Sequence, residues 1–286
     1  PGQRRRRIGL DRTIVCYSMG VMVTEGMRNG FEGMIVGSAA SALSQLEESE
    51  TVLQCHALRS LDVLADLFWH EISPALSKIQ ALSGDEEFPD AKLAALVSAK
   101  VLFHLGELDE ALEYALAAGD RFDVSASSEF SRTLRGRCID EYIAIRVRQD
   151  GQAKDIYPGL GVVVERILDE CVHKGEVQEV LGVALEARRL DRVEDTILNG
   201  CKSAEERVTS LGYCFRCAQT LVASRSYREE VLRLIADLHR REAQPDQVAI
   251  ALCLAFVGDD RGVAEIFSML LSSSASSPEQ EESNEL

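Results

Sequence analysis

A repeated segment constrains the fold of this chain more than any other feature of its sequence. The stretch HLGELDEALEYALAAG, residues 104–119, aligns without a gap with HKGEVQEVLGVALEAR, residues 173–188. The two stretches begin 69 residues apart, close to twice the roughly 34-residue period of helical-hairpin repeats. Identical residues occupy these aligned positions: His104 and His173, Gly106 and Gly175, Glu107 and Glu176, Glu110 and Glu179, Leu112 and Leu181, Ala115 and Ala184, Leu116 and Leu185, Ala118 and Ala187.

Each copy of the repeat predicts an amphipathic helix that begins after a glycine turn. Apolar residues recur at i, i+3, i+4, i+7 and i+8, which places them on one face of a helix. A glycine separates this helix from an apolar run before it, so each copy predicts two helices joined by a turn. We expect Leu112 and Leu181 to be buried at equivalent places. Six positions should carry the repeated structure: Gly106, Leu112, Ala115, Gly175, Leu181 and Ala184.

The fold is expected to be all-α, an α-solenoid of stacked antiparallel helical hairpins of the TPR-like kind. The 286 residues include only six prolines, and no clean alternating run of β-branched residues is bounded by turn dipeptides. A solenoid of this length spreads its core along a rod instead of gathering it in one centre. Helices are expected near these residues: 36–47, 51–72, 74–83, 89–105, 107–118, 128–148, 159–174, 176–188, 190–199, 203–223, 226–241, 245–257 and 260–271.

Changes in composition suggest three parts of the chain. Residues 1–33 carry the basic block Arg4–Arg7 and no sustained period, so we expect a disordered or non-native leader, with initiation near Met34. A localisation signal or a nucleic-acid patch is the alternative for that block. The helical-hairpin rod domain should span 34–271. The Ser- and Glu-rich segment 272–286 should be a disordered linker.

The charge balance limits the classes of partner. The formal net charge is −16 and the sequence pI is about 4.8. A nucleic-acid groove needs clustered Lys and Arg to neutralise phosphates, so we expect no nucleic acid as a partner. No apolar run approaches the roughly 20 residues that a membrane span requires, so we expect no membrane and a soluble protein.

The eight cysteines are scattered, mostly beside Leu, Val and Ala in helical patterns. This distribution predicts reduced, buried thiols of an intracellular protein. Only Cys214 and Cys217 have the spacing of metal ligands, and a zinc site needs two more ligands nearby. No second CxxC and no HxxxH occurs. We therefore expect core packing for this pair, with no metal and no cofactor.

The search for catalytic motifs predicts that the chain is not an enzyme. GxxxxGK[ST], GxSxG, HExxH and a GxGxxG after a strand are all missing. The five histidines are scattered, which disfavours an all-helical hydrolase or transferase and any small-molecule substrate. His104 and His173 each precede a hairpin turn by two positions, where a histidine interacts with the last carbonyls of its helix. An imidazole presented on a binding ridge is the alternative for these histidines. Trp69 should pack in the core or between helices.

Five stretches, read in order, resemble a known family. They are LFWHEISPALSKIQAL, LAALVSAKVLFHLGELDEALEYALAAGDRFDV, SSEFSRTLRGRCIDEYI, GVALEARRLDRVEDTIL and ALCLAFVGDD. Together they are similar to the N-terminal helical region of the regulatory subunit 1 family, the largest non-ATPase scaffold subunits of the 26S proteasome regulatory particle. The resemblance runs from about Met34 to about Leu271. MIVGSAASALSQLEE resembles the family's own N-terminus.

The resemblance implies a non-catalytic scaffold that supports assembly of the regulatory particle and ubiquitin-dependent protein degradation. Its partners would be other lid and base subunits, and its compartments the cytoplasm and the nucleus. The family's ring of repeats does not occur in this sequence, and no catalytic residue of the family falls in the similar segment. The alternative is a free-standing TPR-like adaptor that binds peptide segments of a partner, which basic or Asn residues in a concave groove would favour.

Overall fold

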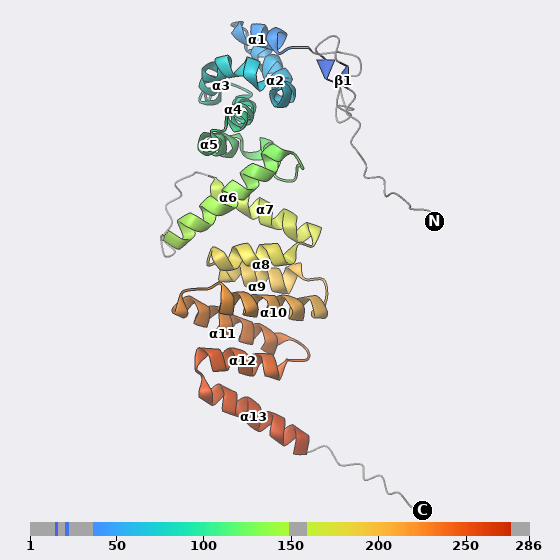
Figure 1. Cartoon of the computed structure of the whole chain (residues 1–286), viewed down its shortest axis with the longest axis vertical. Helices are drawn as coiled ribbons and strands as arrows, with labels where there is room; N and C mark the ends of the chain where they lie inside the picture. The colour runs from blue at the N-terminus through green and yellow to red at the C-terminus, as the bar shows by residue number, and fades with distance from the viewer. Residues whose placement is uncertain (1–14, 17–20, 23–36, 149–158, 276–286) are drawn as a thin grey trace, which may run out of the picture. The chain divides into compact units, whose positions relative to one another are not determined.

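The chain is helical over most of its length. Most of the leader expected at 1–33, and the end of the linker expected at 272–286, lie outside the described residues. Within the leader, the two-residue strands β1 (Val15–Cys16) and β2 (Val21–Met22) pair antiparallel. The computed structural model (Figure 1) describes these residues: 15–16, 21–22, 37–148 and 159–275.

Two compact units divide the chain, Pro1–Phe122 and Asp123–Leu286. In the first unit, α1 packs on α2, and α4 packs on α2, α3 and α5. The helices of this unit have these bounds: α1 Ala40–Glu47, α2 Thr51–Ile72, η1 Ser73–Ala75, α3 Leu76–Ser83, α4 Ala91–Leu105, α5 Leu108–Ala118 and η2 Gly119–Arg121.

Helix α4 forms the centre of the first unit. Its sequence, AKLAALVSAKVLFHL, is apolar on nearly every face, which is typical of a helix surrounded by other helices. Helices α2, α3 and α5 all pack against it. Most of its apolar side chains, among them Leu93, Val97 and Val101, are therefore buried.

The second unit is a stack in which successive helices contact each other. Helix α6 packs on α7 and α8, α8 on α9 and α10, α10 on α11, α11 on α12, and α12 on α13. One apolar core extends from Val177 on α8 to Ile266 on α13. The helices of this unit have these bounds: α6 Glu129–Arg148, α7 Leu160–Lys174, α8 Val177–Glu186, α9 Leu190–Asp195, η3 Thr196–Gly200, α10 Ala204–Thr220, α11 Arg225–Arg241, α12 Gln247–Val257 and α13 Asp260–Ala275.

Every helix expected from the sequence has a counterpart among the described residues, so the all-α prediction is confirmed. The boundaries differ by a few residues. The last helix continues to Ala275, and the helix expected at 190–199 is α9 followed by the π-helical turn η3. Helix α12 begins after Pro245 because Asp246 takes the N-cap, where its carboxylate accepts hydrogen bonds from two backbone N–H groups at 3.0 Å.

The glycine turn of the repeat has the same backbone geometry in both copies. Gly106 and Gly175 have φ angles of +86° and +84°, in the left-handed region that residues with a Cβ rarely enter. In each turn, the N–H groups of the glycine and of the next glutamate donate to carbonyls of the preceding helix, in the Schellman pattern. The bonds that span five residues are Glu107 N to Leu102 O at 3.0 Å and Glu176 N to Cys171 O at 2.9 Å.

Two more turns share this geometry, although aligning the two repeated segments does not identify them. Gly258 joins α12 to α13 with a φ of +83°, and Arg188 joins α8 to α9 with a φ of +54°. Arg188 is the one non-glycine residue with a positive φ in the described part of the chain. It aligns in the repeat with Gly119, whose φ is +59°. The left-handed conformation costs a residue with a Cβ about 1 kcal/mol, so the position favours glycine.

The repeated helix buries the apolar stripe that its sequence predicts. Leu112 on α5 and Leu181 on α8 are 1% and 0% exposed. Ala115 and Ala184 lie on the same stripes and are also buried. Truncation of such a leucine to alanine typically costs about 2–5 kcal/mol, so the two stripes contribute strongly to the stability of their units.

Candidate interaction surfaces

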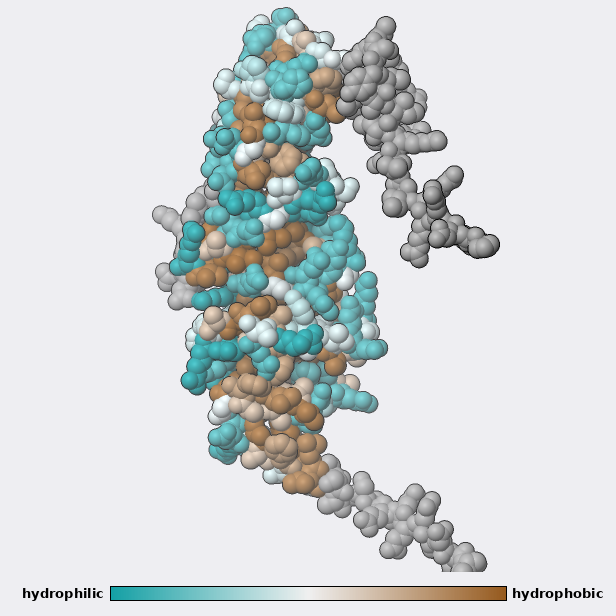
Figure 2. Space-filling view, viewed as in Figure 1, coloured by the Kyte–Doolittle hydropathy of each residue, from teal (hydrophilic) through white to brown (hydrophobic). Residues whose placement is uncertain are grey.

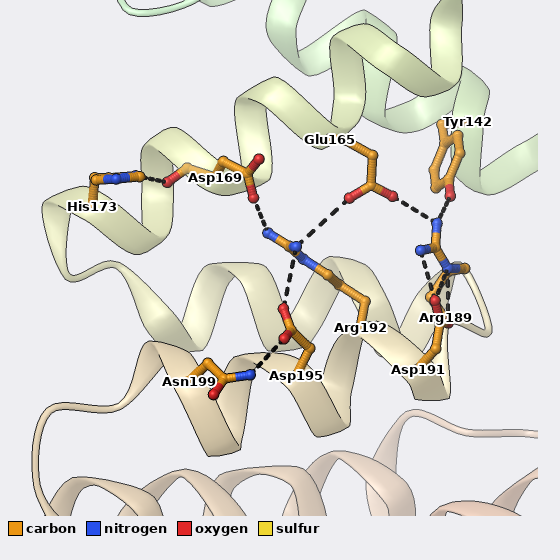
Figure 3. A network of polar contacts seen from close by, with 9 residues as sticks. All are labelled: Tyr142, Glu165, Asp169, His173, Arg189, Asp191, Arg192, Asp195 and Asn199. Atoms are coloured by element: carbon orange, nitrogen blue, oxygen red, sulfur yellow. Dashed lines mark hydrogen bonds and ion pairs between the residues drawn. The ribbon is translucent and has the colours of Figure 1, made fainter.

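A network of polar side chains joins α6, α7 and α9 in the second unit (Figure 3). Arg189, at the N-cap of α9, donates from Nη1 to the hydroxyl of Tyr142 on α6 at 2.6 Å. The same nitrogen donates to the carboxylate of Glu165 on α7 at 2.7 Å. Nε and Nη2 of Arg189 donate hydrogen bonds to the carboxylate of Asp191 at 2.8 and 2.7 Å. The hydrogen bond between the two side chains is the main cause of two shifts: it raises the pKa of Arg189 and lowers the pKa of Asp191.

A second arginine, Arg192, extends the network along α7. Its guanidinium pairs with Asp169 and lies 3.8 Å from Glu165. It also reaches Asp195, one turn further along, which accepts a hydrogen bond from Asn199 at 2.8 Å. Figure 3 shows the Glu165 carboxylate between the two guanidiniums, with one contact to each of them. Paired arginines of this kind fix the position of one helix on another and are not available for chemistry.

The two histidines of the repeat have different surroundings. His173 Nδ1 lies 2.7 Å from the carbonyl oxygen of Asp169 in its own helix, as expected near a helix end. His104 instead faces α2, where its Nε2 is 3.3 Å from a carboxylate oxygen of Asp66. Its ring stacks on Trp69 with centroids 6.0 Å apart. The helix-end prediction is therefore wrong for His104, because α2 supplies both an aromatic and an acidic partner. Trp69 packs between helices, as predicted.

The paired cysteines pack in the core, as their apolar neighbours predict. Cys214 and Cys217 are both buried on α10, and burial raises the pKa of Cys214 to about 12. A thiol with such a pKa stays protonated and is a poor metal ligand or nucleophile. Elsewhere, Cys171, Glu176 and Glu179 place one ligand atom each within 4.8 Å of one another. Both carboxylates are exposed, and burial raises the pKa of Cys171 to about 11.

Two concavities of opposite character lie on the second unit. One, of about 560 Å³, is lined by four glutamates at the start of α8 and α10 and by no Lys or Arg. The other, of about 530 Å³, is lined by Arg146 and Arg188 together with residues of α9 and α11. No histidine lines either concavity, which leaves both without the general base that most hydrolytic sites use.

Helices α12 and α13 expose apolar side chains. Helix α12, QVAIALCLAFV, is apolar on nearly every face, like α4. Among the described helices, α11 and α13 make its main packing contacts, whereas α4 is packed by three helices. Val248, Leu252 and Phe256 follow each other at four-residue spacing and are 63%, 47% and 59% exposed. Phe267 and Leu271 extend the exposed surface onto α13. Figure 2 shows the hydrophobic colour concentrated over these two helices. Contiguous apolar surface is typical of interaction sites, so this surface is a candidate for one.

Within the described residues, every helix is too short or too polar to cross a bilayer. The charged residues of the turn next to the apolar surface of α12 and α13, Asp259, Asp260 and Arg261, are exposed. An apolar surface with a polar rim is the usual composition of a protein–protein interface.

Comparison with known proteins places both helical units in one family. The family described as 26S proteasome subunit RPN2, N-terminal domain, matches residues 37–282. The 26S proteasome non-ATPase regulatory subunit 1 homolog B of Arabidopsis thaliana is 41% identical over 243 residues, which cover 84% of this chain and 24% of the relative. The Drosophila melanogaster non-ATPase regulatory subunit 1 is 40% identical over 244 residues, with the same two shares.

A more distant relative extends the comparison to fungi. The 26S proteasome regulatory subunit rpn2 of Schizosaccharomyces pombe is 35% identical over 240 residues, which cover 83% of this chain and 24% of the relative. The chain spans about a quarter of the length of the curated relatives it matches.

Proposed function

The chain belongs to the 26S proteasome subunit RPN2 family, and from this membership we propose that it is part of a non-catalytic structural scaffold of the proteasome regulatory particle. The scaffold supports assembly of the particle and thereby ubiquitin-dependent protein degradation. The observation that carries the proposal is the continuous match of residues 37–282 to the family's N-terminal domain. The match includes α1 to α13, so it covers the core of each unit.

The architecture of the units supports a scaffold. Stacked helices bury their apolar stripes against each other and leave long outer faces for neighbouring proteins. Residues 37–122 contain 15 Asp and Glu against 5 Lys and Arg, so the outer face of the first unit is acidic. Lys- and Arg-bearing subunits are the expected neighbours of that face, because complementary charge steers association. The apolar surface of α12 and α13 offers a second, uncharged contact.

The chemistry of the described residues supports a non-catalytic role. Burial raises the pKa of Cys138, Cys214 and Cys253 to about 12, so these thiols are unreactive. The five histidines lie on four different helices, α2, α4, α7 and α11. The arginines of the central network are held by carboxylates. These features agree with relatives whose names describe non-ATPase regulatory subunits.

The partners in this proposal are the other lid and base subunits of the regulatory particle, in the cytoplasm and the nucleus. The proposal includes no nucleic acid, membrane or small-molecule substrate: the net charge of −16 disfavours phosphate binding, and no histidine lines either concavity. A free-standing TPR-like adaptor that binds peptide segments is the second candidate. One observation favours it, the concavity lined by Arg146 and Arg188, since a basic groove is suited to an acidic peptide.

Affinity purification of the endogenous, tagged protein followed by mass spectrometry tests the proposal. We expect lid and base subunits of the regulatory particle in amounts close to that of the tagged protein. Recovery of a single unrelated partner, without regulatory-particle subunits, would instead support the adaptor. A second purification after a high-salt wash separates the two kinds of contact, because charged rim contacts weaken with salt while apolar contacts persist.

A further inference from the structure

Three helices of the chain end in the same left-handed glycine turn, so equivalent positions on them can be compared. Helices α4, α7 and α12 are followed by Gly106, Gly175 and Gly258, whose φ angles are +86°, +84° and +83°. Residues two, six and ten positions before each glycine lie on one face of the helix, because they are four residues apart. These faces consist of Leu96, Lys100 and His104 on α4, of Glu165, Asp169 and His173 on α7, and of Val248, Leu252 and Phe256 on α12.

On α4, this face contacts α2 through charged groups. Lys100 Nζ lies 2.7 Å from a carboxylate oxygen of Asp62, and His104 Nε2 lies 3.3 Å from one of Asp66. Asp62 and Asp66 are also four residues apart, so the two helices meet side chain by side chain over a full turn. Leu96, the third residue of the face, is buried. The face of α4 therefore receives a neighbouring helix.

On α7, the equivalent face contacts α9. Glu165 accepts a hydrogen bond from Arg189 Nη1 at 2.7 Å, and Asp169 pairs with Arg192 (Figure 3). Arg189 is the N-cap of α9, and Arg192 lies within that helix. Two of the three glycine-terminated helices thus use the same face to receive another helix, and in both the contact is made by charged side chains.

On α12, the equivalent face is apolar. Val248, Leu252 and Phe256 are exposed, although α11 and α13 pack on other faces of the helix. The ring of Phe256 contacts Phe215 of α10 edge to face, with centroids 5.8 Å apart, so one end of the face is held in place. The face has the position of a helix-receiving surface but lacks the charged groups of α4 and α7. A helix that fits it must therefore bring apolar side chains at four-residue spacing.

The charges at the two ends of the apolar face limit what can bind there. Asp246 lies before its first residue, Asp259 and Asp260 follow its last residue, and all three are exposed. Arg261, beyond them, is paired with Glu265 at 3.3 Å. Lysine or arginine at both ends of an approaching helix would complement these aspartates. A second copy of α12 would bring aspartates to both ends in either orientation, which disfavours a dimer through this face.

The segment that follows α13 has a different composition from the matching helix. Residues 276–286, SSPEQEESNEL, include one large apolar residue, Leu286, and four glutamates. They offer neither apolar side chains at four-residue spacing nor basic ends. This segment is therefore not the ligand of the α12 face.

From the equivalence of the three faces we infer that Val248, Leu252 and Phe256 of α12 dock one amphipathic helix of a partner protein. That helix carries aliphatic or aromatic side chains at four-residue spacing, with lysine or arginine at both ends. Burial of the three exposed apolar side chains drives the docking, and the terminal charges set the position of the helix along α12. The inference rests on the proposed function for the source of the helix, a neighbouring subunit of the regulatory particle.

Fluorescence anisotropy with the purified chain tests the inference. The probes are three fluorescein-labelled peptides with blocked ends, each of about 18 residues, or five helical turns. The first has leucines along one helix face, alanine elsewhere and lysine at both ends. The second has the same composition with the leucines distributed around the helix, and the third has glutamate in place of lysine. We expect saturable binding of the first peptide and binding of the other two that is weaker by about tenfold or more.

Substitutions in the face provide matched variants. Val248→Ser and Leu252→Ser each remove an exposed apolar side chain, and each should weaken binding of the first peptide about fivefold to tenfold. Val52→Ser, at a position of α2 that is 78% exposed, is the control and should leave binding unchanged. Thermal unfolding should give both α12 variants a Tm close to that of the unsubstituted chain, because both side chains are exposed.

The outcomes separate the inference from its alternatives and from the proposed function. Equal binding of the first peptide and either of the others, no saturable binding, or unchanged binding by both α12 variants would overturn the inference. In analytical ultracentrifugation we expect a monomer. A dimer that dissociates on Leu252→Ser would also overturn the inference, because the face would then bind a second copy. Each of these results leaves the mass-spectrometric test of the proposed function unaffected, because these assays contain no other proteasome subunit.

Discussion

Arg189 Nη1 lies 2.6 Å from the hydroxyl oxygen of Tyr142 and so ties the start of α9 directly to α6. The same guanidinium bonds Glu165 on α7, so one side chain contacts three helices of the stack. Its side chain is only 23% exposed, which protects these bonds from competition by water. The relative position of α6, α7 and α9 is thus set by a polar network as well as by apolar packing.

Removal of this guanidinium should destabilise the second unit. Arg189→Met keeps the length of the side chain but leaves Asp191 without its arginine and Glu165 with Arg192 as its remaining cation. We expect a loss of about 2 kcal/mol in the free energy of unfolding, measured by urea denaturation. Arg225→Met is the control: it removes a pair with Glu229 whose arginine is 86% exposed, and it should change stability by less than about 0.5 kcal/mol. Equal effects of the two substitutions would contradict the role given to the network.

The glycine turns offer a comparison in which only the backbone angle differs. A Cβ added at Gly106 or at Gly136 meets no atom within 4 Å, but Gly106 has a φ of +86° and Gly136 lies inside α6. Gly106→Ala should therefore cost about 1 kcal/mol. Gly136→Ala should be neutral or stabilise by up to about 1 kcal/mol, because alanine favours a helix. Both shifts can be read from urea midpoints, and the same sign for both would refute the explanation.

A charge in the repeated apolar stripe should be poorly tolerated. Leu112→Asp and Leu181→Asp place a carboxylate at fully buried positions, and each should destabilise by several kcal/mol, roughly 3 or more. Val162→Asp on α7 is the control, because Val162 is 68% exposed. Circular dichroism during thermal unfolding gives the comparison. A Tm for Leu112→Asp close to that of Val162→Asp would show that the buried face has been misassigned.

Buried His239 should make stability depend on pH. Burial lowers its pKa below the usual 6.5, although Asp246 and Glu242 act in the opposite direction. Because the unfolded chain binds the proton first, stability is complete above about pH 6.5 and is lost as pH falls from there through the folded pKa. We expect a loss of up to about 1 kcal/mol between pH 7.5 and 5.5 that is absent in His239→Gln. An identical pH dependence in both proteins would exclude His239 as its source.

The helices could be predicted because their signals are local. Gly106, Gly175 and the apolar spacing after each of them lie within one stretch of chain, and the structure places a left-handed turn and a buried stripe there. The turn at Gly258 cannot be recognised by alignment because few of its side chains match, although its backbone hydrogen bonds are the same. Arg188 could not be found in this way, since an arginine in a left-handed turn has no sequence signature.

The surfaces could not be predicted because they depend on contacts between distant residues. His104 turns towards Asp66, which is 38 residues away, and Arg189 reaches Tyr142, which is 47 residues away. Helix α12 has the apolar composition of a fully surrounded helix, but Val248 and Phe256 are exposed, because in the described part of the chain α11 and α13 leave one of its faces uncovered. Periodicity identifies which face of a helix is apolar, and it does not say which neighbour covers that face.

Depletion of the endogenous protein, followed by native gel electrophoresis of proteasomes, tests the central claim most directly. A non-catalytic scaffold predicts loss of complete regulatory-particle caps and accumulation of ubiquitin conjugates, while the peptidase activity of the free core particle is unchanged. Re-expression of the intact protein should restore the caps. Normal caps after complete depletion would contradict the account, because a structural subunit cannot be removed without loss of the assembly that it supports.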